Sequence, residues 1–174
     1  MTTTESIRHD FLTGRLGRRE IILDCTATIA TSGGYDAVKM RAIADRAGMA
    51  VGTLYRYFPS KPHVLIAVLA REFERIGAER DWTVTAGSPR LRVEQLNTRL
   101  CQEWRARPAL TEAVTRAFVV ADGSASAEVA RAAGVIEHLI GLAIARLGDR
   151  SADVSAAGWP DAGAVEEIAA AARA

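Results

Sequence analysis

The 174-residue chain has little that favours a membrane protein, a secreted protein or a β-sheet protein. No apolar run is long enough to cross a bilayer, and the first residues lack the apolar stretch of a secretory signal. Only 6% of the residues are aromatic, whereas alanine is abundant, which favours helices over sheets. These absences predict an all-α, cytoplasmic protein with no membrane partner.

The chain also lacks the side-chain groupings of common enzymes and metal sites. Cys25 and Cys101 have no CxxC spacing, and the three histidines are scattered, without Glu or Cys at metal-ligand spacing. No nucleophile elbow, phosphate-binding Gly-rich loop or dinucleotide fingerprint is present. We therefore expect no enzyme activity, no metal and no cofactor, and we expect both cysteines to be buried and reduced.

Charge is distributed unevenly along the sequence. Residues 1–63 hold nine Lys and Arg against six Asp and Glu, whereas the remainder is mildly acidic. A basic head on an acidic body is typical of a protein that meets phosphates at one end. The predicted parts are a flexible basic arm at 1–17, a three-helix head at 18–63, a helical body at 64–148 and a Gly/Ala-rich tail with a short helix at 149–174.

Apolar residues at helical spacing, interrupted by Gly and Pro, predict seven helices before the tail. Gly33 and Gly34 are expected to end the first helix, and Ser60 is expected to be the N-cap of the fourth. The first expected helix begins at Arg18, the second and third span about 40–47 and 51–57, and the fourth runs from Ser60 to near Arg80. The fifth is expected to start near Pro89, the sixth at Pro108 and the seventh after Gly123-Ser124.

The second and third helices, joined at Gly48, have the dimensions of a helix-turn-helix. A helix that enters the DNA major groove needs small residues near the backbone, donors for phosphates and side chains that reach base edges. Gly52 meets the first need. The predicted phosphate donors are Thr53, Tyr57 and Lys61, and the predicted base-edge contacts are Arg41, Val51 and Tyr55.

Several of these residues have a second interpretation. Leu54 and Phe58 are expected to be core, and Tyr55 either contacts DNA or stacks between the helices. Arg41 and Lys61 are either DNA contacts or solvated surface charges. His63, in the first turn of the fourth helix, is expected to contact a phosphate or to be exposed. Four arm residues are expected to add nonspecific affinity by counterion release, or to form a basic tail: Arg8, Arg15, Arg18 and Arg19.

The run AIADRAGMAVGTLYRYFPSK resembles the DNA-binding helices of the TetR family of regulators. Within that family, GGYDAVKMRAIADRAGMAVGTLYRYFPSKPH and RPALTEAVTRAFVVAD resemble the KstR-type repressors of steroid catabolism in actinobacteria. The family pattern assigns groove contacts to Arg41, Val51, Gly52 and Tyr55, and phosphate contacts to Thr53, Tyr57 and Lys61. One departure is Ala50, where many relatives have serine, so a hydroxyl contact is absent.

The resemblance implies a homodimer that binds a palindromic operator of double-stranded DNA. It also implies a body that binds a small hydrophobic or acyl-CoA ligand, with release from DNA by a steroid acyl-CoA thioester. The candidate ligand contacts, which are otherwise plain core, are Phe73, Trp104, Phe118 and Leu139.

The tail is the part that resembles the family least. The family pairs through its last two helices, whereas the resemblance fades after about residue 147 into a Gly/Ala/Pro-rich segment. Either the dimer uses the seventh helix and a degenerate tail, or the last part is missing or altered. The alternative function is therefore a helical ligand-binding or interaction protein with impaired DNA regulation. A cofactor-independent helical enzyme is a further alternative, and the missing catalytic cluster argues against it.

Overall fold

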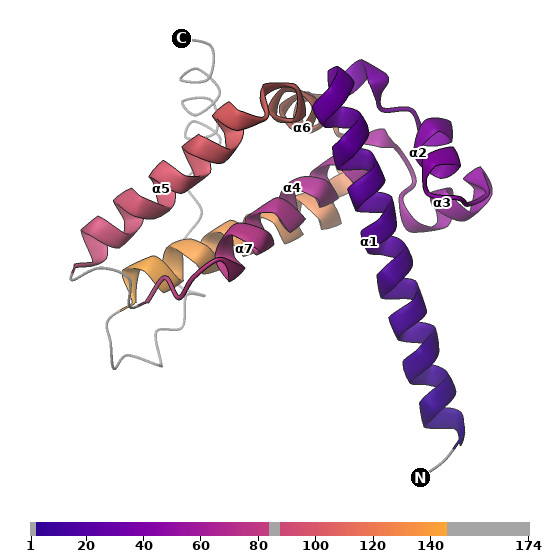
Figure 1. The fold of residues 1–174 in the computed structure, drawn as a ribbon, viewed down its shortest axis with the longest axis horizontal. Helices are drawn as coiled ribbons and strands as arrows, with labels where there is room; N and C mark the ends of the chain where they lie inside the picture. The colour runs from indigo at the N-terminus through magenta and orange to yellow at the C-terminus, as the bar shows by residue number, and fades with distance from the viewer. Residues whose placement is uncertain (1–2, 84–87, 146–174) are drawn as a thin grey trace.

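The computed structural model describes residues 3–83 and 88–145, and the predicted tail at 149–174 lies outside that part. Within it the secondary structure is helical, which confirms the all-α fold class. The elements (Figure 1) are α1 (Thr3–Ala37), α2 (Met40–Arg46), α3 (Val51–Tyr57), α4 (Lys61–Ala78), α5 (Pro89–Ala106), α6 (Pro108–Val120), the short 3-10 helix η1 (Gly123–Ala125) and α7 (Ser126–Ile144).

The first helix is longer than the sequence pattern predicts. α1 begins at Thr3, so helix lies on both sides of the predicted boundary between arm and head. Gly14 and Gly17 do not end it, since a glycine in a helix costs only about 1 kcal/mol. The break predicted at the paired glycines is confirmed, because Gly33 and Gly34 have non-helical backbone angles. Gly34 has a φ of 64°, a conformation that favours glycine.

The later helices begin where the sequence pattern places them. Pro89 and Pro108 each occupy the start of a helix, where the missing N–H of proline is tolerated. The hydroxyl of Ser88 accepts a hydrogen bond from the Leu91 N–H at 3.3 Å and so caps α5. Ser60 is the N-cap residue of α4, as predicted, but its hydroxyl makes no capping bond to the backbone.

Helix α4 is the central element of the packing. α4 and α7 run side by side, α6 packs against both α1 and α4, and α5 lies on α7 (Figure 1). The short helices α2 and α3 lie beside α1, next to the start of α4. None of the helices in the described ranges has the length and hydrophobicity that a bilayer crossing requires.

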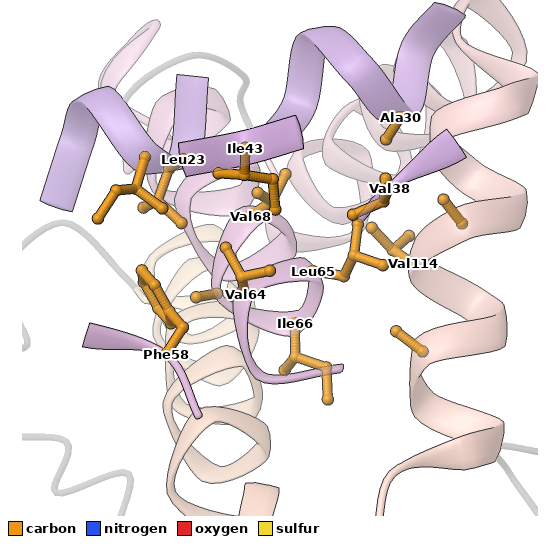
Figure 2. Packing of buried hydrophobic residues seen from close by; sticks show 14 of the residues in the cluster. Leu23, Ala30, Val38, Ile43, Phe58, Val64, Leu65, Ile66, Val68 and Val114 are labelled. Atoms are coloured by element: carbon orange, nitrogen blue, oxygen red, sulfur yellow. The ribbon is translucent and has the colours of Figure 1, made fainter. Parts of the chain in front are cut away.

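One hydrophobic cluster joins the predicted head to the predicted body. It includes buried residues from α1, α2, α3 and the first half of α4, together with residues of α6 and α7. Figure 2 shows Val64, Leu65 and Val68 of α4 among Ile43 of α2 and Val114 of α6. The apolar core is therefore continuous across residues 63 and 64, where the sequence pattern places the boundary between head and body.

A second cluster lies at the far end of α4, between α5 and α7. Its buried members include Phe73, Trp82, Leu96 and Leu139. Arg92 of α5 is 4% exposed, and its guanidinium donates to the carbonyls of Ala143 at 2.8 Å and of Ala145 at 2.5 Å. These bonds satisfy carbonyls that the end of α7 leaves without helical partners.

Leu65→Ala should lower the free energy of unfolding by about 2–5 kcal/mol, because Leu65 is fully buried and its truncation leaves a cavity. The control Val119→Ala should change it by less than about 0.5 kcal/mol, since Val119 is 80% exposed. Chemical denaturation monitored by circular dichroism measures both. Equal effects for the two variants would contradict the packing around α4.

Candidate nucleic-acid interface

The turn between α2 and α3 is a short, well-bonded connection. The Ala47 N–H donates to the Ile43 carbonyl at 2.9 Å, and the Met49 N–H donates to the Ala44 carbonyl at 3.0 Å. Gly48 between them has a φ of 64°, which a residue with a side chain rarely adopts. The turn thus sets α3 at a defined angle to α2, as a helix-turn-helix requires.

Helix α3 presents one face to solvent and buries the other. Leu54 is fully buried and Phe58 is 1% exposed, as the sequence analysis predicts. Val51 is 40% exposed and Tyr55 is 49% exposed. With an apolar residue and an aromatic ring on its outer face, α3 has the form of a helix that contacts another molecule.

The predicted DNA contacts fall into two groups. Those on the open surface are Arg41, Val51, Gly52 and Tyr55, whereas Thr53, Tyr57 and Lys61 are half-buried. Tyr55 is not stacked in the core, so that interpretation of its role was wrong. Arg56 is also exposed and follows Gly52 by one helical turn, so it lies on the same face of α3. The helical period could have placed Arg56 on this face from the sequence alone.

Lys61 has partners within the protein. Its ammonium donates to the Tyr35 carbonyl at 3.0 Å and lies 3.9 Å from the centre of the Tyr35 ring. Burial lowers the pKa of the Lys61 ammonium from its ordinary value, and the nearby Asp36 carboxylate opposes that effect. Lys61 thus ties the start of α4 to the end of α1.

Helix α6 holds the same segment from the other side. The Tyr35 N–H donates to the Glu112 carboxylate at 3.0 Å, and the Arg116 guanidinium lies 4.7 Å from the centre of the Tyr35 ring. Arg116 also pairs with Asp36 at 3.1 Å. The end of α1 is therefore bound both by α4, through Lys61, and by α6.

Other polar residues of the head also have structural roles. Arg19 lies 5.3 Å from the centre of the Phe58 ring, and burial lowers the pKa of its guanidinium. Arg18 is exposed, whereas Arg8 and Arg15 lie outside the residues whose side chains the structure describes. His63 is 4% exposed and hydrogen-bonded, so the expectation that it is exposed or free for a phosphate was wrong. Its burial depends on contacts distant in sequence.

The two cysteines are free thiols but only partly buried. Cys25 and Cys101 both have intermediate exposure, which corrects the expectation of full burial. Each lies at the edge of its helix's apolar stripe, where the helical period alone does not fix the degree of burial. Burial raises the pKa of the Cys25 thiol, which favours the less reactive protonated form.

The candidate ligand contacts in the body do not all lie together. Phe73, Trp104 and Leu139 share the second cluster, and the Phe73 and Trp104 rings are 6.2 Å apart at 47°. Phe118 packs instead against the first cluster, because α6 directs this side chain to the other end of α4. The four residues therefore do not line a single site.

The space between α4, α5 and α6 is small. The cavity there has a volume of about 20 Å³ and is lined in part by Leu69, Trp104 and Val114. A volume of this size holds roughly one water molecule. Glu72 and Arg107 line this cavity, and they also line a surface groove of about 410 Å³ between α1 and α4.

Ion pairs join the helices beside the cavity between α4, α5 and α6. Arg107 pairs with Glu72 at 2.6 Å, and Arg75 pairs with Glu103 at 2.9 Å, which links α4, α5 and the start of α6. Within the two described ranges, no group of three or more His, Cys, Asp or Glu has a metal-binding arrangement.

Two family models match the chain, one to each part. The model of "Bacterial regulatory proteins, tetR family" matches residues 22–68, which include α2 and α3. The model of "Tetracyclin repressor-like, C-terminal domain" matches residues 87–171. The second match continues through the tail, so the expectation that the resemblance fades near residue 147 was wrong. Composition obscured it, since small residues weaken an apolar pattern without removing family similarity.

The sequence is similar to transcriptional repressors from other bacteria. The chain is 50% identical to "HTH-type transcriptional repressor KstR" of Mycobacterium tuberculosis over 74% of its own length and 59% of that protein. This chain is also 56% identical to the protein of the same name from Mycolicibacterium smegmatis, and that match covers 64% of this chain and 55% of the relative. The chain thus spans less than three fifths of the length of these relatives.

A solved structure supports the same fold. The crystal structure of a TetR transcriptional regulator from Rhodococcus sp. RHA1 matches with a TM-score of 0.65 and 29% sequence identity. The match covers 73% of this chain and 68% of that one.

Tyr55→Ala and Leu54→Ala should differ sharply in their effect on the free energy of unfolding, although the two residues are neighbours on α3. Leu54→Ala should lower the free energy of unfolding by about 2–5 kcal/mol, because the side chain is fully buried. Tyr55→Ala should change it by less than about 1 kcal/mol, because half of the side chain is already in solvent. Thermal and urea denaturation test this, and a large loss for Tyr55→Ala would mean that the ring is structural.

Proposed function

Because the chain belongs to the TetR family of bacterial regulatory proteins, we propose that it is a transcriptional repressor that binds operator DNA through α2 and α3. The observation that carries the proposal is the outer face of α3. That face is open to solvent, includes an exposed aromatic ring, and is held in place by Leu54 and Phe58 in the core. A rigid helix with such a face suits the DNA major groove.

In the proposed complex, α3 lies in the groove with Val51, Gly52 and Tyr55 towards the bases. The absence of a side chain at Gly52 allows the backbone close approach, and Arg41 of α2 reaches the groove from the side. The hydroxyls of Thr53 and Tyr57 and the ammonium of Lys61 are the proposed phosphate contacts. Lys61 has two N–H groups beyond the one that donates to Tyr35, so the two roles are compatible.

Operator control requires two heads. One head makes few contacts, whereas a dimer places two recognition helices in successive major grooves, about 34–36 Å apart. We therefore include a homodimer and a palindromic operator in the proposal. The family similarity that continues to residue 171 supports it, since relatives with a full C-terminal domain pair through that part.

The proposed ligand is a small hydrophobic molecule, of which a steroid acyl-CoA thioester is the best candidate, and the controlled genes are those of lipid or steroid catabolism. The similarity to KstR repressors supports this choice. Ligand sites of this kind have volumes of about 300–1,000 Å³, far above the 20 Å³ between α4, α5 and α6. Binding beside Phe73, Trp104 and Leu139 would therefore separate these helices and move α4, which bears the head.

The second candidate is a protein of the same fold that binds a ligand or a partner but no longer controls DNA. The observation that favours it is that the three predicted phosphate contacts, Thr53, Tyr57 and Lys61, are half-buried, and that Lys61 already donates to the Tyr35 carbonyl. DNA binding separates the two candidates directly.

The DNA proposal predicts that Tyr55→Ala weakens binding to the palindrome upstream of the protein's own gene by about 1–3 kcal/mol. Arg41→Gln should weaken binding by a similar amount, because it removes a cation from the groove. The matched controls are Leu91→Ala, at a side chain of similar exposure, and Arg90→Gln on the outside of α5. Gel shifts or fluorescence anisotropy at two salt concentrations, about 50 and 200 mM, give the affinities and the salt slope.

If the wild-type protein binds the palindrome no better than unrelated DNA, the second candidate function replaces the repressor. If it binds well but Tyr55→Ala behaves like Leu91→Ala, the repressor stands and the assignment of the α3 face is wrong.

The ligand proposal predicts that a steroid acyl-CoA thioester raises the melting temperature and releases the operator. At about 100 times its Kd, a ligand that binds the folded state adds about 2.7 kcal/mol of stability. Free coenzyme A is the control, because it lacks the apolar part, and Trp104→Ala should weaken the effect. A thioester that changes neither melting nor DNA binding would remove steroid control from the proposal.

A further inference from the structure

His63 makes a polar contact between the start of α4 and the turn that joins α6 to α7. The ring is 4% exposed. Its Nδ1 lies 2.8 Å from the Ser60 hydroxyl, and its Nε2 lies 3.1 Å from the carbonyl oxygen of Ser124 in η1. Both ring nitrogens of this buried side chain are therefore satisfied, one on each side of the contact.

The chemistry of the two partners determines which nitrogen of the His63 ring donates a hydrogen bond and which accepts one. A carbonyl oxygen only accepts hydrogen bonds, so Nε2 carries a hydrogen and donates it to Ser124. In the neutral ring, Nδ1 then accepts a hydrogen bond from the Ser60 hydroxyl. Ser60 is the N-cap residue of α4, yet its hydroxyl makes no capping bond to a backbone N–H of that helix. A group that usually caps a helix is used here to orient the histidine.

The Ser124 carbonyl is itself held in a fixed position. The Asp122 carboxylate accepts hydrogen bonds from the Ser124 N–H at 2.9 Å and from the Ser124 hydroxyl. The Ala125 N–H donates to the Asp122 carbonyl at 3.1 Å, and the Ala125 side chain is 1% exposed within the first hydrophobic cluster. A shift of α6 or α7 would therefore move this carbonyl and the histidine bonded to it.

We infer that His63 is a positioning residue that couples the α6–α7 turn to the DNA-binding helices. The path is short: Ser124 binds His63, His63 binds Ser60, and Ser60 lies two residues after Phe58, which anchors the end of α3 in the core. This inference rests on the proposed function, because it concerns how the body acts on DNA binding. Coupling between two sites is reciprocal, so operator binding must also affect the turn.

Hydrogen–deuterium exchange on the full chain, with and without operator DNA, tests the coupling without a ligand. In the wild type, DNA should slow exchange of the Ser124 and Ala125 amides by about 5-fold or more. His63→Phe keeps an aromatic ring in the site and removes both hydrogen bonds, so the DNA-dependent slowing should disappear. Ser60→Ala should also abolish it, although the bond between His63 and Ser124 remains.

Ser126→Ala is the matched control, because it alters an exposed serine of the same turn but keeps the bonds that join Ser124, His63 and Ser60. This variant should retain the slowing seen in the wild type. If His63→Phe melts too low to measure, Ser60→Ala decides the question, since Ser60 is half-buried and its loss leaves no large cavity.

The outcomes separate the coupling from the proposed function. Slowing in the wild type that is lost in His63→Phe or Ser60→Ala supports the inference. Firm DNA binding without slowing in the wild type, or equal slowing in both variants, overturns the inference and leaves the repressor intact. Failure of the wild type to bind DNA overturns the proposed function, and the coupling with it.

Discussion

The burial of the first half of α4 against α1, α2, α3 and α6 is the constraint on which the rest of the structure depends. Val64, Leu65 and Val68 are fully buried in a cluster that also contains Leu54 and Phe58 (Figure 2). Short helices such as α2 and α3 are marginal on their own, so their stability comes from this packing. The same burial determines which face of α3 remains open to a partner.

Polar contacts fix the relative positions of the helices that pack around the first half of α4. Hydrophobic burial holds helices together but does not by itself fix their relative positions, whereas hydrogen bonds and ion pairs have preferred geometries. At the start of α4, Lys61 joins Tyr35 of α1, and His63 joins Ser124 of the α6–α7 turn. The helix that follows the recognition helix is therefore connected to both the head and the body. A protein that transmits a change from a ligand to DNA requires such a connection.

The small volume of the cavity between α4, α5 and α6 limits how a ligand can bind in the body. Trp104 lies beside this cavity of about 20 Å³, and Glu72 and Arg107, which also line it, pair with each other. Since a protein interior is close-packed, a ligand cannot enter without displacing helices. The proposed ligand response would therefore require the helices around Trp104 to move, and one of them, α4, contributes to both hydrophobic clusters.

Local chemistry made most of the helices and the core side of α3 predictable from the sequence. Proline fixes its own backbone angle and glycine permits the turn conformation, and the helical period places Leu54 and Phe58 on one shared face of α3. The motif around Gly48 identified the helix-turn-helix for the same reason.

The tertiary structure alone decided the burial and the partners of the polar and aromatic side chains. His63 is buried because Ser124, 61 residues away, accepts its hydrogen bond, and Phe118 is separated from Phe73 because α6 meets the other end of α4. Such contacts depend on how helices cross in space, which neither spacing nor composition specifies.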